Sequence, residues 1–190
     1  NILGEHVQQK GSLVNEEKLR FDFSHKQKLS ESEIVKIEQE VNQAITSAED
    51  TQIIETSIEE SQKLGAIAFF GEKYGDQVRV LKIAGDYSTE LCGGTHVKNS
   101  SDIKSFKIIS ETSISSGVRR IEAISGDLAI KDKADNKTDL LNTAETFNVS
   151  VKDLPIFLKD KTKVINSYKE DLKKNEQKIY QNLLDDLKGS

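Results

Sequence analysis

Hydrophobic residues recur with different periods along the chain, and each period predicts an element. Between residues 19 and 23, Leu and Phe alternate with Arg and Asp, which predicts a half-buried strand. Ser30 and Glu33 form the Ser-x-x-Glu pattern of a helix capping box. The apolar residues behind this box share one helical stripe, so we expect a helix from about residue 31 to residue 48. The stripe consists of Ile34, Ile37, Val41, Ala44 and Ile45.

Shorter apolar runs, separated by turn residues, predict further elements as far as Gly126. We expect a strand at 51–55, a short helix at 58–64 that Gly65 ends, a buried strand or turn at 66–70, and strands at 78–83, 103–110 and 118–125. Helices mixed with strands of this kind predict an α+β domain over residues 1–126, with a mostly antiparallel sheet.

The pattern changes after Gly126. Residues 127–188 contain no Gly, and they include the only Pro of the chain, Pro155. Two helices are predicted there, and Ser150 is suited to cap the second one. Apolar residues in the second helix recur every seven positions, at Leu158, Ile165, Leu172 and Ile179. We therefore expect residues 127–190 to form a helical linker. The pattern favours a hairpin of two antiparallel helices, and the alternative is a weak intermolecular coiled coil.

The composition narrows the class of protein. Charged residues make up 31% and hydrophobic residues 35% of the chain, and the mean hydropathy is -0.54. No apolar run approaches the roughly 20 residues that a membrane span needs, so we expect no membrane association. A single Cys excludes an internal disulfide framework and predicts a reducing, cytoplasmic location.

The charges and the first residue add two expectations. A net charge of -5 argues against a strong, nonspecific nucleic-acid binder. The acidity is concentrated in residues 31–60, with nine acids and one Lys, whereas residues 98–125 carry five bases and three acids. The chain has no Met and begins with Asn1, so we expect it to be a segment of a larger protein.

The chain's only Cys lies four residues before one of its three His. Thiolate and imidazole are preferred zinc ligands, and Gly93 and Gly94 between them allow the backbone to turn so that Cys92 and His96 face one point. A Cys-x-x-x-His pair alone is a weak signal, and the alternative is a buried thiol in a Gly-rich turn.

Three stretches resemble the editing domains of alanyl-tRNA synthetases. Residues 87–97, Tyr-Ser-Thr-Glu-Leu-Cys-Gly-Gly-Thr-His-Val, resemble the metal motif of that family, and residues 117–126 resemble its closing strand. Residues 3–14 and 19–25 are similar to its opening segment. The resemblance covers residues 1–126, and the helical linker fits the family's layout by its position.

The resemblance implies hydrolysis of Ser-tRNA(Ala) and Gly-tRNA(Ala), within an enzyme that ligates alanine to tRNA(Ala). It implies one zinc ion held by a His-x-x-x-His pair and by a pair that Cys92 and His96 match. The first pair is expected upstream of Asn1, so the isolated segment is expected to be inactive. ATP and Mg would act only in a catalytic domain outside the segment.

The resemblance also implies roles for further residues. Gln9 would line the editing pocket, and Gly93, Gly94 and Thr95 are weaker candidates for contacting the substrate. Arg119 and Arg120 would contact tRNA phosphates, although a surface ion pair is an equal alternative for each of them. Other domains of the same protein are expected partners, and a homo-oligomer is compatible with the helical linker. The alternative functions are a non-catalytic RNA-binding or dimerisation module and a free-standing trans-editing protein.

Overall fold

The structure, a computed structural model, describes residues 2–68, 75–85 and 87–188 of the 190-residue chain. Their internal contacts divide the chain into two units, residues 1–133 and residues 134–190, and each is described by itself. In chain order the elements are β1 (Gln9–Val14), β2 (Leu19–Ser24), α1 (Glu31–Thr46), β3 (Gln52–Ser57), α2 (Ile58–Lys63), β4 (Gln77–Ile83), β5 (Ser88–Leu91), the 3₁₀ helix η1 (Ser100–Ile103), β6 (Phe106–Ser115), β7 (Val118–Ser125), α3 (Gly126–Thr146) and α4 (Leu154–Lys188).

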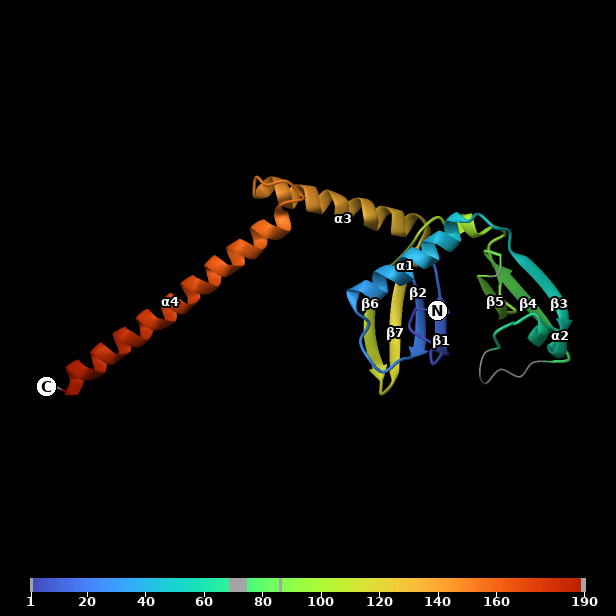
Figure 1. Cartoon of the computed structure of the whole chain (residues 1–190), viewed down its shortest axis with the longest axis horizontal. Helices are drawn as coiled ribbons and strands as arrows, with labels where there is room; N and C mark the ends of the chain where they lie inside the picture. Colours follow the sequence, from blue (N-terminus) through green and yellow to red (C-terminus); the bar gives the residue numbers. More distant parts are fainter. Residues whose placement is uncertain (1, 69–74, 86, 189–190) are drawn as a thin grey trace. The chain divides into compact units, whose positions relative to one another are not determined.

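The first unit contains a four-stranded antiparallel sheet in the order β1-β2-β7-β6 (Figure 1). β2 pairs with β7 over its whole length, from Leu19 opposite Ala123 to Ser24 opposite Val118. The alternation of residues 19–23 directs Phe23 into a core in which it is 1% exposed. Helix α1 packs against this core through Ile34 and Ile37. The core residues are Phe23, Leu29, Ile108, Ile121 and Ala123.

The second sheet of this unit has three antiparallel strands in the order β3-β4-β5. Its core cluster consists of Val78, Val80 and Leu91, and Ile58 of α2 packs against them. After α2, Ile67 forms a parallel bridge with Glu90 of β5, and its amide donates to the carbonyl of Thr89. The chain at Ile67 therefore pairs with the free edge of β5.

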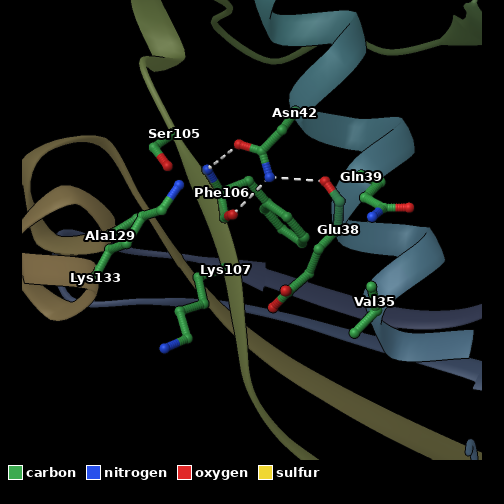
Figure 2. A pocket seen from close by; sticks show the side chains of 9 residues that line it. All are labelled: Val35, Glu38, Gln39, Asn42, Ser105, Phe106, Lys107, Ala129 and Lys133. Carbon is green, nitrogen blue, oxygen red and sulfur yellow. Dashed lines mark hydrogen bonds between the residues drawn. The ribbon is translucent and has the colours of Figure 1, made fainter. Parts of the chain in front are cut away.

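Helix α1 is tied to the four-stranded sheet by Asn42. The Asn42 side chain accepts a hydrogen bond from the Phe106 amide at 3.0 Å and donates one to the Phe106 carbonyl at 2.9 Å (Figure 2). Glu38, one turn earlier, accepts from the Ile108 amide at 2.7 Å. These two side chains supply the edge of β6 with partners that a further strand would otherwise provide.

The predicted α+β class and the antiparallel sheets are confirmed. The capping box at Ser30 is present, and α1 ends at Thr46, two residues before the predicted end. The strand predicted from residue 103 begins at Phe106, because Asn99 caps a 3₁₀ turn that occupies residues 100–103. In the predicted segment 66–70, Ile67 is 61% exposed rather than buried, and residues 69–70 lie outside the described part.

The second unit consists of the rest of α3 and of α4. The junction between them is packed: Ala144 and Leu154 are each 3% exposed, and the Phe147 and Phe157 rings lie 5.3 Å apart. The heptad stripe of α4 is exposed along the described residues. Among these residues, the two helices therefore bury apolar side chains against each other only at the junction between them. The exposed fractions are 42% for Leu158, 52% for Ile165, 63% for Leu172 and 60% for Ile179. A search of the described helices for one long and apolar enough to cross a bilayer finds none.

Candidate functional site

The Cys-x-x-x-His segment begins where β5 ends. Leu91 pairs with Val80 of β4 as the last residue of β5, and the Cys92 amide then donates to the Arg79 carbonyl at 3.1 Å. Residues 92–97 form neither helix nor strand. Gly93, Gly94 and Thr95 are exposed in this loop, so the metal loop, as we call residues 92–96, can be reached from solvent.

The two predicted ligands flank the second glycine of the metal loop. A methyl group built on Gly94 would lie 3.7 Å from the Cys92 Sγ, 3.8 Å from the His96 Cε1 and 4.0 Å from the His96 Nε2. Thiol and imidazole therefore both lie close to one backbone position. Cys92 is a free thiol and is partly buried.

The His96 imidazole is suited to bind a metal ion. Burial lowers its pKa below the ordinary value of 6.5, and the Arg79 charge lowers it further, whereas the Glu90 charge and the main chain of Gly94 act in the opposite direction. The ring is therefore neutral at physiological pH, which is the state of a metal ligand. Its Nδ1 is buried without a hydrogen-bond partner among the described residues. Such an orphaned nitrogen is the kind of atom that a metal ion or a bound group satisfies.

The donors fit zinc in kind but supply only part of a set. In the part of the chain that the structure describes, no three His, Cys, Asp or Glu residues gather closely enough to hold a metal ion. The other two His, His6 and His25, are hydrogen-bonded to each other, with Nε2 2.8 Å from Nδ1. A structural zinc site needs four protein ligands and a catalytic one about three. Cys92 and His96 thus form half of the expected set.

Gln9 lies in a cavity of about 550 Å³ between the two sheets of the first unit. The cavity is bounded by Val7 and Phe21 on one side and by Ile67 and Glu90 on the other. Sequence reasoning found Gln9 but missed Ile67 and Glu90, because the bridge between them joins residues far apart in the chain. Glu90 precedes Cys92 by two residues in the chain, and the residues that line the cavity include neither Cys92 nor His96.

A second cavity, of about 460 Å³, lies between α1, the beginning of β6 and the start of α3 (Figure 2). None of the residues predicted for a site lines it. Lys107, on its wall, forms an ion pair with Asp132. Of the residues predicted for a site, Gln9 lines the first of these two cavities and none lines the second.

Both predicted tRNA-contacting arginines are bound to carboxylates. Arg119 donates to Glu111, with Nη2 2.7 Å from Oε2, and the carboxylate side chain is 2% exposed. Arg120 donates through two nitrogens to Asp22, at 2.7 and 2.8 Å. Each arginine thus forms an ion pair, which was the alternative to a tRNA contact in the sequence analysis. A tRNA contact by either arginine stays a prediction.

Comparison with known proteins finds one matching family and many similar chains. Residues 78–122, which include the metal loop, match the family described as the threonyl and alanyl tRNA synthetase second additional domain. The alanine–tRNA ligase of Alkaliphilus metalliredigens is 62% identical over 128 residues, covering 67% of this chain and 14% of that protein.

Two further alanine–tRNA ligases match most of the chain. That of Alkaliphilus oremlandii is 48% identical over 182 residues, covering 92% of this chain and 21% of that protein. That of Francisella tularensis subsp. novicida is 44% identical over 187 residues, covering 98% of this chain and 22% of that protein. The chain thus spans about a fifth of the length of these two curated relatives.

Proposed function

The chain belongs to the alanyl-tRNA synthetase family, and on this premise we propose that it is the editing part of such an enzyme. Its substrates are Ser-tRNA(Ala) and Gly-tRNA(Ala), in which the wrong amino acid is esterified to the terminal ribose. A pocket that selects alanine discriminates against one extra or missing small group by only about 1–3 kcal/mol, so a second, hydrolytic site is needed. The observation that carries the proposal is that Gln9 lines one cavity with Glu90, which precedes Cys92 of the metal loop by two residues.

The lining of the cavity is suited to bind a small aminoacyl group. Its apolar walls, Val7, Phe21 and Ile67, leave room for a short side chain, and the Gln9 amide is able both to donate to and to accept from a serine hydroxyl. The ester is cleaved when a water oxygen bonds to the carbonyl carbon and the bond to the ribose oxygen breaks. The water supplies one proton to that ribose oxygen and one to the solvent. Gln9 orients the ester in this step.

We further propose that the metal loop binds zinc. Cys92 and His96 are two of its ligands, and the family resemblance assigns the other two to histidines upstream of Asn1. When bound, zinc supplies a positive charge that polarises an oxygen or orients the substrate. Gly93, Gly94 and Thr95 are exposed beside it and are available to contact the RNA end.

The remaining assignments concern the whole enzyme. tRNA(Ala) is its nucleic-acid partner, alanine is ligated with ATP and Mg in a domain outside this chain, and the enzyme acts in the cytoplasm. These proposals rest on the alanine–tRNA ligases that the chain matches.

A second function, dimerisation through the helical unit, is favoured by one observation. The heptad stripe of α4 leaves Leu172 and Ile179 about three-fifths exposed, which suits contact with a second copy. This role is compatible with editing in the first unit.

The test is deacylation of Ser-tRNA(Ala), measured for this chain and for a longer polypeptide that includes the expected upstream histidines. We expect activity in the longer polypeptide and little in the chain. Gln9→Ala should lower the rate about tenfold or more, because an oriented polar contact in the reaction is lost. Cys92→Ala should lower it at least as much. Gln27→Ala, an exposed residue outside the cavity, is the matched control. The proposal fails if the longer polypeptide does not deacylate Ser-tRNA(Ala).

A further inference from the structure

Arg79 of β4 is charged and partly buried, yet it forms no ion pair with a carboxylate of the described residues. Its Nη1 instead donates two hydrogen bonds to main-chain carbonyl oxygens. One is 3.0 Å long and ends on Cys92, and the other is 2.6 Å long and ends on Gly94. A guanidinium group that donates to two main-chain carbonyls restrains the shape of the backbone that carries them.

The two carbonyls belong to the metal loop and lie on either side of Gly93. The Cys92 amide also donates to the carbonyl of Arg79 itself, so the loop is joined to this residue by its main chain and by its side chain. Within the described residues, the main chain of residues 93–97 forms no other hydrogen bond to the backbone. Arg79 is therefore the principal restraint on a loop whose two glycines permit many conformations.

The shape that Arg79 holds is the one that brings the two ligands together. Fixing the carbonyls of Cys92 and Gly94 fixes the peptide unit before Gly93 and the peptide unit after Gly94. The Cys92 Sγ and the His96 ring then both lie within about 4 Å of one point, the Cβ position of Gly94. Without the restraint, Gly93 and Gly94 would let the thiol and the imidazole move independently.

We propose that Arg79 is a positioning residue that holds the metal loop in the conformation in which Cys92 and His96 bind one metal ion. This role rests on the proposed metal site and deepens it. Arg79 does not touch the ion. It acts through the backbone, as groups outside the ligand set commonly do when they orient ligands. A lysine at this position would keep the charge but, lacking the planar fork, would hold the two carbonyls less well.

The test is a titration with Co²⁺, followed by the thiolate-to-cobalt charge-transfer absorption, of this chain and of the longer polypeptide with the upstream histidines. Cys92→Ala should abolish the band, which verifies that the band reports the metal loop. Arg79→Met, which keeps length but removes the donors, should weaken Co²⁺ binding about 10- to 100-fold. Arg79→Lys should recover part of that loss. Lys98→Met removes an exposed positive charge two residues after His96 and should leave binding unchanged.

The outcomes separate the two proposals. If neither unsubstituted polypeptide gives a thiolate band, the metal site is wrong and the role of Arg79 falls with it. If the band is present and Arg79→Met binds Co²⁺ as tightly as the unsubstituted protein, the metal site stands and the positioning role is overturned. Equal losses for Arg79→Met and Lys98→Met would also overturn that role, because they would indicate a general effect of charge.

Discussion

At the scale of single residues, the Asp22 carboxylate is a buried and paired ionisable group of the four-stranded sheet. It is 6% exposed, it accepts two hydrogen bonds from Arg120 on the neighbouring strand, and Arg20 lies 3.7 Å away. Asp22→Asn should therefore lower the urea midpoint of the first unit, because it leaves Arg120 without its carboxylate. The control is Glu16→Gln, an exposed carboxylate in the turn before β2, which should leave the midpoint unchanged.

The same carboxylate makes a prediction about pH. The hydrogen bond from Arg120 lowers the pKa of Asp22 below its ordinary value of 3.8, so the folded state binds the proton less readily than the unfolded state does. The stabilisation is complete above pH 3.8 and is lost as the pH falls through the lowered pKa. The gap between Asp22→Asn and the unsubstituted chain should therefore shrink in acid. A gap that grew as the pH fell below 3.8 would contradict the ion pair.

The sequence predicts site residues well where they are adjacent in the chain and poorly where they meet across strands. Cys92 and His96 are four residues apart and were recognisable as a pair. Gln9 was found through the resemblance of its motif. Glu90 and Arg79 were missed as site residues, because their positions depend on the pairing of β4 with β5 and on the bridge to Ile67. That register is set by burial of Val80 and Leu91, which the sequence does not reveal locally.

At the scale of elements, α1 is attached to β6 by the polar side chains of Asn42 and Glu38, and Asn42 makes two of these hydrogen bonds. Asn42 satisfies both main-chain groups of Phe106, so Asn42→Ala leaves a partly buried amide and carbonyl without partners. We expect the free energy of unfolding to fall by about 1–3 kcal/mol, measured by urea denaturation. Gln39→Ala is the matched control, since Gln39 lies on the same helix and lines the same cavity (Figure 2). Equal effects of the two substitutions would show that the loss comes from the helix and not from the bonds to β6.

The sequence failed to predict β1 and β5, two strands that form only because a neighbouring strand pairs with them. β1 carries the residues Gln-Lys-Gly-Ser-Leu-Val, which do not alternate, and it forms the edge of its sheet with Leu13 and Val14 exposed. β5 has four residues and buries only Leu91. Neither has a periodic apolar face, so each is a strand because β2 or β4 offers it hydrogen bonds. Long amphipathic elements such as α1 do not depend on a partner in this way and were predicted closely.

At the scale of the whole molecule, the division into two units predicts that each unfolds separately. In the first unit Phe23 is 1% exposed in the core, so Phe23→Ala should destabilise that unit by about 3–5 kcal/mol. In the second unit, the described apolar side chains of α4 are largely exposed, so α4 lacks the tertiary burial that stabilises most helices and should open readily.

Hydrogen exchange of separate peptides measures both units in one experiment. Phe23→Ala should speed exchange in β2 and β7 and leave α4 unchanged, whereas Phe147→Ala, at the helix junction, should do the reverse. If either substitution sped exchange equally in both units, the chain would unfold as a single cooperative structure and the division would be wrong.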